Sequence, residues 1–361
     1  MKAAVMQQVG DAKLEVRDDV TLASPGPNQV RVKIRAAGVC HSDLSAMTGT
    51  LPQPPNSVLG HEGAGEIVEV GSAVTALAVG DHVIVNWAPA CGVCTVCVAD
   101  QPYLCMAYLA EAFTSPPFDI GGTPGFGMAG TGTWTEETIL PQQGAIKIDP
   151  AIPFDIAALV GCGVMTGAGA AINSAKVKPG STVVVIGCGG VGISAIQGAR
   201  VAGARVIVGV DMLDQKLEWA RELGATHTAM PDQLDALKAE LTSGGMGFDY
   251  AFEVVGRSDT MRQAYDAARR GGMVVVIGAG RMDDMVQLSA FELFYNEKTI
   301  QPSYYGSAHV TRDFPLLLGL WQAGKLDLEG LISRRIALED INDAVEALKR
   351  GEVLRQIIQF D

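Results

Sequence analysis

Short apolar runs that end at turn signals dominate the first 150 residues. Val30–Ile34, Gly65–Val70 and His82–Val85 are runs of this kind, and pairs such as Pro25-Gly26 and Gly71-Ser72 bound them. Such bounded runs are typical of β-strands. Because no helical stretches alternate with them, the pattern predicts a compact β-rich domain.

The pattern changes near Pro179, where strand-like runs begin to alternate with helical stretches. The predicted strands are Thr182–Ile186, Arg205–Val210, Tyr250–Val254 and Met273–Ile277. One predicted helix ends at Arg200, a second spans Gln215–Leu223, and a third lies around Thr260–Arg269. Alternation at this spacing predicts a doubly wound parallel sheet. The tail adds a predicted helix near Leu338–Arg350 and a last strand near Ile357–Phe360.

Two long stretches, Ile156–Ala175 and Thr182–Ala199, carry no charge. Glycine and polar residues interrupt both, and the second begins as a β-rich run, so we expect buried elements of a soluble domain. The first residues, MKAAVMQQVG, lack the apolar core of a secretory signal. We therefore expect a cytoplasmic protein with no membrane partner.

The composition is that of a globular protein, with 361 residues of which 48% are hydrophobic and 19% charged. This length suggests about two domains. A net charge of −13 would repel phosphate backbones and anionic lipid, which argues against a nucleic-acid partner. Seven cysteines, an odd number without an export signal, favour metal binding over disulfides.

The clearest motif is GxGxxG at residues 187–192, which follows a predicted strand and opens a predicted helix. Gly187 permits the tight turn, Gly189 lets the backbone approach a pyrophosphate, and Gly192 allows close helix–strand packing. Gly190 and Val191 open the helix, whose free N–H groups would face the phosphates. The alternative, an ordinary glycine turn, does not account for this strand–turn–helix context.

Asp211 closes the next predicted strand, 24 residues after Gly187. Its carboxylate would accept hydrogen bonds from an adenosine ribose and would repel a 2′-phosphate. The following residues, Met212 and Leu213, supply no arginine that could bind such a phosphate. The motif therefore favours NAD over NADP.

Four cysteines follow the spacing Cys91-x2-Cys94-x2-Cys97-x7-Cys105. Four thiolates can close a tetrahedral shell around one Zn²⁺ and leave no position for substrate. We expect a structural zinc that pins an exposed lobe without a core. Disulfides are the alternative, and a reducing compartment disfavours them.

Cys40, His61 and Cys162 are further candidates, although no local spacing links them. Two thiolates and one neutral imidazole would balance the charge of Zn²⁺ and leave a fourth position open. Taken singly, each is more simply a buried cysteine or a core histidine. Cys188, inside the glycine turn, is expected to be a bystander.

Together these motifs resemble the zinc-dependent medium-chain alcohol dehydrogenases over nearly the whole chain. The matching segments are VCHSD (39–43), GHEGAGEI (60–67), the cysteine lobe, GCGVMTG (161–167), IGCGGVG (186–192) and LRQIIQF (354–360). The segments GCGVMTGAGAAIN and NWAP are most similar to the aryl or allylic alcohol branch and to the thiol-dependent formaldehyde branch.

The resemblance implies roles for individual residues. A catalytic zinc would be held by Cys40, His61 and Cys162, with Asp43 orienting His61 and Glu62 behind the metal. The positions that match cofactor contacts are His41, Thr166, Lys216, Ala279 and Arg355. For Arg355 the alternative is a solvated charge.

The implied reaction is hydride transfer between NAD and an alcohol, with zinc as a Lewis acid on the substrate oxygen. Ser42 takes the position that relays the proton. Many family members have a histidine three residues later, where this chain has Ser45. Proton release would therefore end at His41 or at ordered water.

Substrate specificity is less determined by the sequence. Trp87 matches the family's pocket wall, and the further candidates for an aromatic and thioether lining are Met128, Trp134, Tyr304 and Tyr305. The alternative is that several of these fill the core. Leu109 stands where the glutathione-dependent branch has an arginine, which argues against a glutathione adduct as the substrate.

We therefore expect an NAD-dependent zinc dehydrogenase of primary, aromatic or allylic, alcohols and their aldehydes. The alternatives are an S-(hydroxymethyl)thiol-type formaldehyde dehydrogenase, a non-catalytic zinc- and NAD-binding protein, and an enzyme whose cofactor never leaves. The expected architecture is a β-rich GroES-like catalytic zinc domain (residues 1–163 and 305–361) around an NAD-binding Rossmann domain (164–304), with the active cleft between them. By analogy, a homodimer forms through edge strands of the Rossmann sheets.

Overall fold

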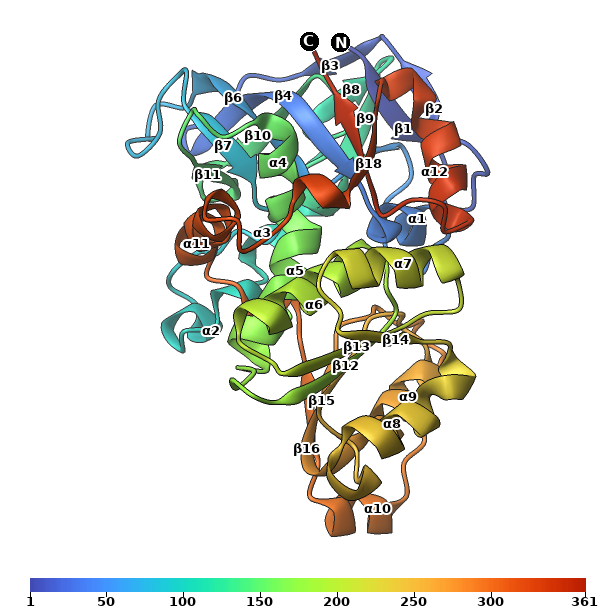
Figure 1. Cartoon of the computed structure of the whole chain (residues 1–361). Coiled ribbons are helices and arrows are strands. Elements are labelled where there is room, and N and C mark those ends of the chain that lie inside the picture. Colours follow the sequence, from blue (N-terminus) through green and yellow to red (C-terminus); the bar gives the residue numbers. More distant parts are fainter. The chain divides into compact units, whose positions relative to one another are not determined.

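The computed structural model describes all 361 residues, and the chain divides into two compact units (Figure 1). The first unit consists of Met1–Cys162, His309–Gly319 and Ile332–Asp361, and the second of Gly163–Ala308 and Leu320–Leu331. Both ends of the chain therefore belong to the first unit.

Two sheets, in which most strand pairs are antiparallel, build the first unit. One has the order β2-β1-β5-β9-β8-β3, with β1 Ala3–Met6, β2 Glu15–Arg17, β3 Val20–Leu22, β5 Ser57–Val58, β8 Phe118–Ile120 and β9 Thr123–Gly127. The other has the order β11-β7-β6-β4-β19-β18, with β4 Gln29–Val39, β6 Gly63–Val70, β7 His82–Val85, β11 Ala145–Lys147, β18 Ile332–Ile336 and β19 Arg355–Gln359. Strand β10, Glu137–Pro141, pairs with β4 outside this order.

The long strand β4 shows how the sequence sets this arrangement. Val30, Val32 and Ile34 are buried, whereas the charged residues between them stay half-exposed, as expected for a strand with one face on the core. From Ala36 to Val39 every residue is buried. The end of the strand, and Cys40 directly after it, therefore lie inside the unit.

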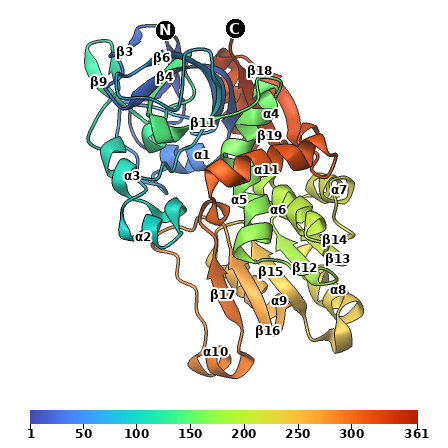
Figure 2. The ribbon, with the colours of Figure 1, turned by 90° about the vertical axis from the view of Figure 1, so that its left-hand side faces the viewer.

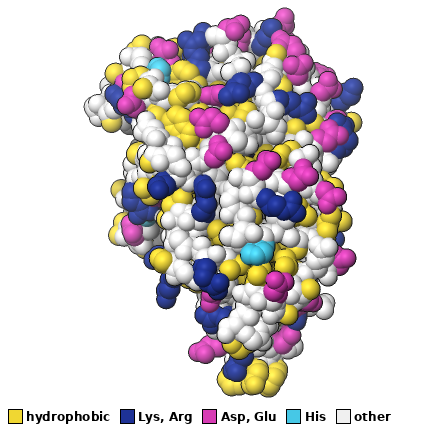
Figure 3. Space-filling model, viewed as in Figure 1, with side chains coloured by type: hydrophobic (Ala, Val, Ile, Leu, Met, Phe, Trp, Pro, Cys, Tyr) yellow, Lys and Arg dark blue, Asp and Glu magenta, His cyan; other side chains and the backbone are white.

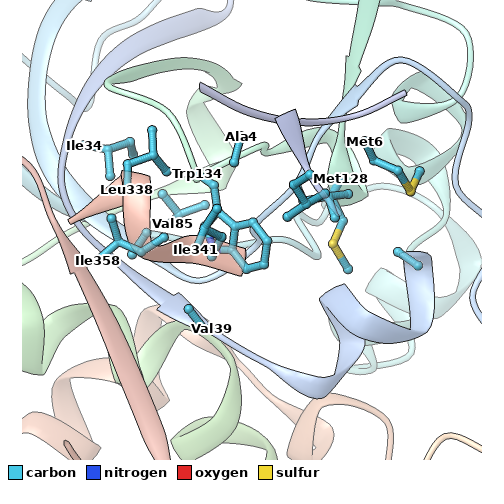
Figure 4. Packing of buried hydrophobic residues seen from close by; sticks show 14 of the residues in the cluster. Ala4, Met6, Ile34, Val39, Val85, Met128, Trp134, Leu338, Ile341 and Ile358 are labelled. Carbon is cyan, nitrogen blue, oxygen red and sulfur yellow. The ribbon is translucent and has the colours of Figure 1, made fainter. Parts of the chain in front are cut away.

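The main core of the first unit gathers side chains from both sheets and from two helices, α1 and α12. Figure 4 shows Ile34 of β4 and Ile358 of β19 in the same cluster as Trp134, Met128 and Ile341. The helices of this unit are α1 His41–Met47, α2 Thr95–Val98, α3 Ala107–Ala112, α4 Phe154–Leu159 and α12 Ile341–Lys349, and α11 Val310–Gln322 begins in it.

The second unit is built on a six-stranded sheet that is parallel throughout, with the order β14-β13-β12-β15-β16-β17. Its strands are β12 Thr182–Ile186, β13 Val206–Val210, β14 His227–Ala229, β15 Phe248–Glu253, β16 Ala268–Val276 and β17 Thr299–Pro302. Its helices are α5 Met165–Gly169, α6 Gly190–Val201, α7 Asp214–Glu222, α8 Leu234–Leu241, α9 Ser258–Ala267 and α10 Ala290–Asn296.

In chain order this sheet reads 3-2-1-4-5-6, the order of dinucleotide-binding Rossmann domains. Helices α6 and α7 cover one face, and α8 and α9 cover the other (Figure 1). The edge strand β17 lies beside β16, with α10 beyond the ends of both (Figure 2). The predicted architecture, a β-rich domain with a doubly wound parallel sheet, is confirmed.

The two uncharged stretches are buried elements, as predicted. A continuous helical segment, Phe154–Ser174, is long and apolar enough to cross a membrane, but 83% of its most apolar window is buried inside the protein. The stretch that starts at Thr182 is strand β12 followed by helix α6. Residues 106–134, which follow the cysteine lobe, contain the short elements α3, β8 and β9.

Glycine permits a close approach of α5 and α6. A methyl group on Gly198 of α6 would lie 2.8 Å from the Cα of Ala168 in α5, so the two helices would have to separate. Gly319 in α11 has no heavy atom within 4 Å of the same point and is exposed. The two glycines are therefore a matched pair.

We predict that Gly198→Ala lowers the free energy of unfolding by about 1–3 kcal/mol, the usual cost of overpacking. Gly319→Ala should be neutral or stabilise the protein by up to about 1 kcal/mol, because alanine favours a helix over glycine. Urea unfolding of both variants measures the difference. Equal effects of the two substitutions would contradict the close packing of α5 on α6.

Candidate functional site

Two thiols, one imidazole and one carboxylate converge inside the first unit. The ligand atoms of Cys40, His61, Glu62 and Cys162 all lie within 4.8 Å of one another, and all four residues are buried. Cys40 stands between β4 and α1, and His61 and Glu62 directly precede β6. Cys162 lies in a π-helical turn, Val160–Val164, which follows α4. Such turns occur often at functional sites.

Asp43 in the first turn of α1 holds two of these segments in place. One carboxylate oxygen accepts the backbone N–H of Cys40 at 3.0 Å. The other accepts the backbone N–H of Gly60 at 3.1 Å and lies 3.1 Å from Nδ1 of His61. A carboxylate on Nδ1 fixes the ring and aims Nε2 at the other ligands.

The chemistry of the cluster fits a zinc ion. Nε2 of His61 is buried and has no hydrogen-bond partner. A hydrogen bond from the Cys162 thiol, together with the Arg355 charge, holds the pKa of Cys40 well below its ordinary value despite burial. The hydrogen bond that Cys162 gives to Cys40 in turn raises the pKa of Cys162. One sulfur that deprotonates readily, a second sulfur and an unpartnered imidazole nitrogen are the donor set of a catalytic zinc site.

Glu62 forms a buried ion pair with Arg355 of β19, whose Nη2 donates to Oε1 of Glu62. Burial raises the pKa of Glu62 to about 7, although the Arg355 charge acts in the opposite direction. A Cβ on Gly38 would collide with the Glu62 carboxylate, so a larger residue there would have to displace this side chain. The alternative for Arg355, a solvated charge, is wrong because the side chain is buried and paired.

This ion pair is a feature that the sequence analysis missed. Its partners are 293 positions apart in the chain, so no local pattern connects them. The available signal was an arginine as the only charge in the run LRQIIQF, because a charge inside a buried strand requires a partner.

The four cysteines of the lobe also converge. Cys94 Sγ lies 3.5 Å from Cys97 Sγ and 3.8 Å from Cys105 Sγ. These distances are far longer than a disulfide, about 2.05 Å. They match the roughly 3.8 Å between two thiolates on one tetrahedral Zn²⁺. Backbone N–H groups of Val93 and Cys94 lower the pKa of Cys91 to about 6, which favours the thiolate.

The lobe has little apolar packing of its own. Val93, Val98 and Met106 are exposed by 81%, 75% and 63%. The lobe contacts the residue directly before α11, His309, whose Nε2 lies 3.1 Å from the backbone oxygen of Asp100. A metal held by four sulfurs would supply the stability that a core cannot.

In the second unit the glycine motif forms the turn between β12 and α6. Gly187 has a φ of +99°, a conformation that favours glycine. A Cβ on Gly192 would collide with the carbonyl of Gly187, so the helix packs directly on the turn. No atom lies within 4 Å of a Cβ on Gly189, which leaves room for a ligand to approach. The helix then begins with Gly190 and Val191.

Asp211 directly follows β13, at the carboxyl edge of the sheet. One of its carboxylate oxygens accepts the backbone N–H of Cys188 at 2.9 Å, and the other accepts that of Leu213 at 3.2 Å. Nζ of Lys216 is 3.8 Å away. The turn therefore holds the Asp211 carboxylate at the edge where nucleotides bind in such sheets. Cys188 contributes its backbone, while its thiol is buried.

The remaining candidates for catalysis and cofactor contact fall in both units. His41 is the exposed first residue of α1, and Ser42 Oγ lies 3.8 Å from Cys40 Sγ. Thr166 lies in α5, and the exposed Ala279 follows β16. Thr166 and Ala279 thus belong to the unit that carries the glycine motif.

The candidates for the substrate pocket separate into two groups. The Trp87 ring meets the His61 ring edge-on, with a centroid distance of 6.3 Å. Met128 is 5% exposed and Trp134 is fully buried, and both belong to the main core. In the second unit Tyr305 is buried and Tyr304 is 46% exposed. Of these candidates, Trp87 is the one whose ring contacts His61 of the buried ligand cluster.

Comparison with known proteins identifies the family of this chain. Residues 26–150 match the family profile described as "Alcohol dehydrogenase GroES-like domain", and residues 190–322 match "Zinc-binding dehydrogenase". An alcohol dehydrogenase class-3 of Cereibacter sphaeroides is 36% identical, with 99% of each chain covered. An S-(hydroxymethyl)glutathione dehydrogenase of Paracoccus denitrificans is 34% identical, again with 99% of each chain covered.

Solved structures show the same relationship. The crystal structure of benzyl alcohol dehydrogenase from Acinetobacter calcoaceticus superimposes with a TM-score of 0.92 at 33% identity, covering 100% of this chain and 99% of that one. Another neighbour, at 27% identity and a TM-score of 0.81, was solved with NADP bound. Zinc and a nicotinamide cofactor are therefore supported for this protein. The chain belongs to the zinc-binding medium-chain alcohol dehydrogenase family and is an oxidoreductase.

Proposed function

We propose that this protein is an NAD-dependent zinc enzyme that interconverts primary alcohols, aromatic or allylic in preference, with their aldehydes. The observation that carries the proposal is the buried cluster of Cys40, His61 and Cys162, in which Nε2 of His61 has no partner. Zinc held there would act as a Lewis acid that polarises the substrate oxygen.

The protein's own residues would serve this reaction in distinct ways. Asp43 keeps His61 in the tautomer whose Nε2 is available as a ligand. The Ser42 hydroxyl, close to Cys40 Sγ, accepts the substrate proton and passes it on. The Arg355 charge, held in place by its pairing with Glu62, stabilises the negative charge that the two sulfurs bring into the interior.

The second unit would bind NAD. The N–H groups at the start of α6 would bind the pyrophosphate, where Gly189 leaves room. Asp211 would accept hydrogen bonds from the adenosine ribose hydroxyls, and its charge would repel a 2′-phosphate. Lys216, Thr166, Ala279, His41 and Arg355 are proposed as further cofactor contacts.

Two observations support aromatic or allylic substrates. The edge of the Trp87 ring faces His61, so an aromatic wall lies beside the proposed metal. A solved relative of similar size is a benzyl alcohol dehydrogenase. An S-(hydroxymethyl)thiol adduct is the second candidate, because a curated relative acts on S-(hydroxymethyl)glutathione.

We propose a homodimer as the working form. The edge strand β17 is exposed at Ile300, and α10 exposes Phe291 and Phe294 by 68% and 81%. Figure 3 shows hydrophobic side chains at the tip that Figure 1 labels α10. An edge strand and an apolar cluster side by side are the features that a second copy of the chain would cover.

The first test is NADH formation with benzyl alcohol, hexanol and formaldehyde plus a low-molecular-weight thiol, using NAD and then NADP. We expect turnover with benzyl alcohol and NAD, and at least about tenfold lower kcat/KM with NADP because of the Asp211 charge. Activity only with formaldehyde and thiol would select the second candidate. Equal use of NADP would contradict the role of Asp211.

The second test concerns the metal. We predict that Cys40→Ser reduces zinc from two ions per chain to one and lowers kcat/KM by at least about a thousandfold, since the polarising ion would be lost. Zinc content by mass spectrometry of the metal and NADH formation measure the two effects. Cys188→Ser is the control for zinc content, because this thiol lies outside both cysteine clusters and should leave both zinc ions in place. Full zinc content in Cys40→Ser would contradict the proposed site.

The third test concerns the dimer. We predict that Phe294→Asp weakens self-association by at least about thirtyfold, the effect of losing one central apolar contact worth about 2 kcal/mol. Sedimentation equilibrium measures the dissociation constant. Met246→Asp is the control, because Met246 is 66% exposed elsewhere in the second unit. A wild-type monomer, or equal effects of both variants, would overturn the proposed interface.

A further inference from the structure

Trp134 touches both chain segments that carry the first two proposed zinc ligands. Its indole Nε1–H donates to the carbonyl of Gly38 at 3.0 Å, two residues before Cys40. Its backbone N–H donates to the carbonyl of Leu59 at 2.9 Å, two residues before His61. One residue thus spans the two segments at equivalent positions.

The neighbouring residue, Thr133, adds to this contact. Its backbone N–H donates to the carbonyl of Gly60 at 2.9 Å, and its hydroxyl donates to the carbonyl of Glu62 at 2.9 Å. The stretch on both sides of His61 is therefore bound to the segment that ends in Trp134. The indole bond to Gly38 extends the same connection to the end of β4.

The shape of the site shows that Trp134 is fitted to it. Gly60 has a φ of +89°, and a Cβ there would collide with Cδ1 of the Trp134 ring. The indole therefore lies directly against the backbone before His61. Gly38 donates its N–H to the carbonyl of Glu62 at 3.1 Å, while its own carbonyl accepts the indole N–H.

Filling the core does not require this hydrogen bond. Trp134 is fully buried among apolar side chains (Figure 4), and a phenylalanine would fill most of the same volume. The indole differs from a phenyl ring by its N–H donor, and a buried N–H requires an acceptor. Here the acceptor belongs to the segment of a ligand, which links the packing of the core to the site.

We propose that Trp134 is a positioning residue that sets the spacing of Cys40 and His61 through its indole N–H and its backbone N–H. It contacts neither substrate nor cofactor. The inference rests on the proposed zinc role of Cys40 and His61, so its test reads the metal itself rather than turnover. Residues that orient metal ligands change metal affinity by about tenfold to a hundredfold when they are removed.

The experiment compares Trp134→Phe with the wild-type protein, both loaded with zinc. A chelator removes the ion while a colour indicator reports the released metal. We expect the variant to lose the zinc at Cys40, His61 and Cys162 at a chelator concentration at least about tenfold lower than the wild type does. The lobe zinc at Cys91–Cys105 should be released as in the wild type. With cobalt in the labile site, the visible bands should shift in energy and intensity.

Trp321→Phe is the matched control. Its indole donates to Glu329 at 2.7 Å in the second unit, so this variant also loses one indole hydrogen bond. It should leave zinc release and the cobalt spectrum unchanged. A change in both tryptophan variants would mean a general loss of stability and would overturn the proposal.

The outcomes separate the two hypotheses. If Trp134→Phe lowers only the thermal midpoint while zinc release and the cobalt bands match the wild type, Trp134 is a core residue and the proposal is overturned. If the wild type holds only the lobe zinc, the proposed function itself fails. Should Trp134→Phe not fold, hydrogen exchange of the wild-type indole N–H gives the answer, because zinc must slow it if the bond and the site are coupled. An unchanged exchange rate would overturn the coupling.

Discussion

The first unit must hold several ionisable side chains close together in its interior. Two thiols, a histidine and Glu62 meet within 4.8 Å, with Asp43 directly behind the histidine. Burying charge is costly unless each charge has a partner. Arg355 provides one positive charge beside Glu62. A divalent cation between the two sulfurs and Nε2 of His61 would offset the negative charge of the two thiolates.

The fold meets this constraint with strand ends and tight turns rather than with one continuous motif. Strand β4 delivers Cys40, the turn before β6 delivers His61, and a π-helical turn delivers Cys162. Glycine at positions 38 and 60 permits the close approach of these segments, because a Cβ there would collide with its neighbours. The site is thus built into the backbone packing, and a change in the core can reach the ligands without touching them.

Sequence reasoning succeeded where the information is local. The glycine motif, Asp211 and the four lobe cysteines lie within short stretches. Strands β12, β13, β15 and β16 and helices α6, α7 and α9 were placed to within about five residues, whereas β14, β17, α8 and α10 were not predicted. The cluster of Cys40, His61 and Cys162 has no such spacing and followed only from the family resemblance. The predicted domain boundaries and the roles of individual site residues stay predictions.

Long-range contacts explain what the sequence did not reveal. The Glu62–Arg355 pair joins residues 293 positions apart, and the bond from Trp134 to Gly38 joins residues 96 positions apart. An aromatic residue near a predicted site suggested a substrate wall, but Trp134 is in the core. Burial alone distinguishes these two roles, and burial depends on the whole fold.

The most direct test of the account is X-ray diffraction from crystals of the wild-type protein on both sides of the zinc absorption edge. The account predicts two anomalous peaks per chain. One lies among Cys40 Sγ, His61 Nε2 and Cys162 Sγ, and the other lies among the four sulfurs of Cys91, Cys94, Cys97 and Cys105. A fully loaded protein with a peak only at the lobe would contradict the central claim, since the buried cluster would then be stable without a metal.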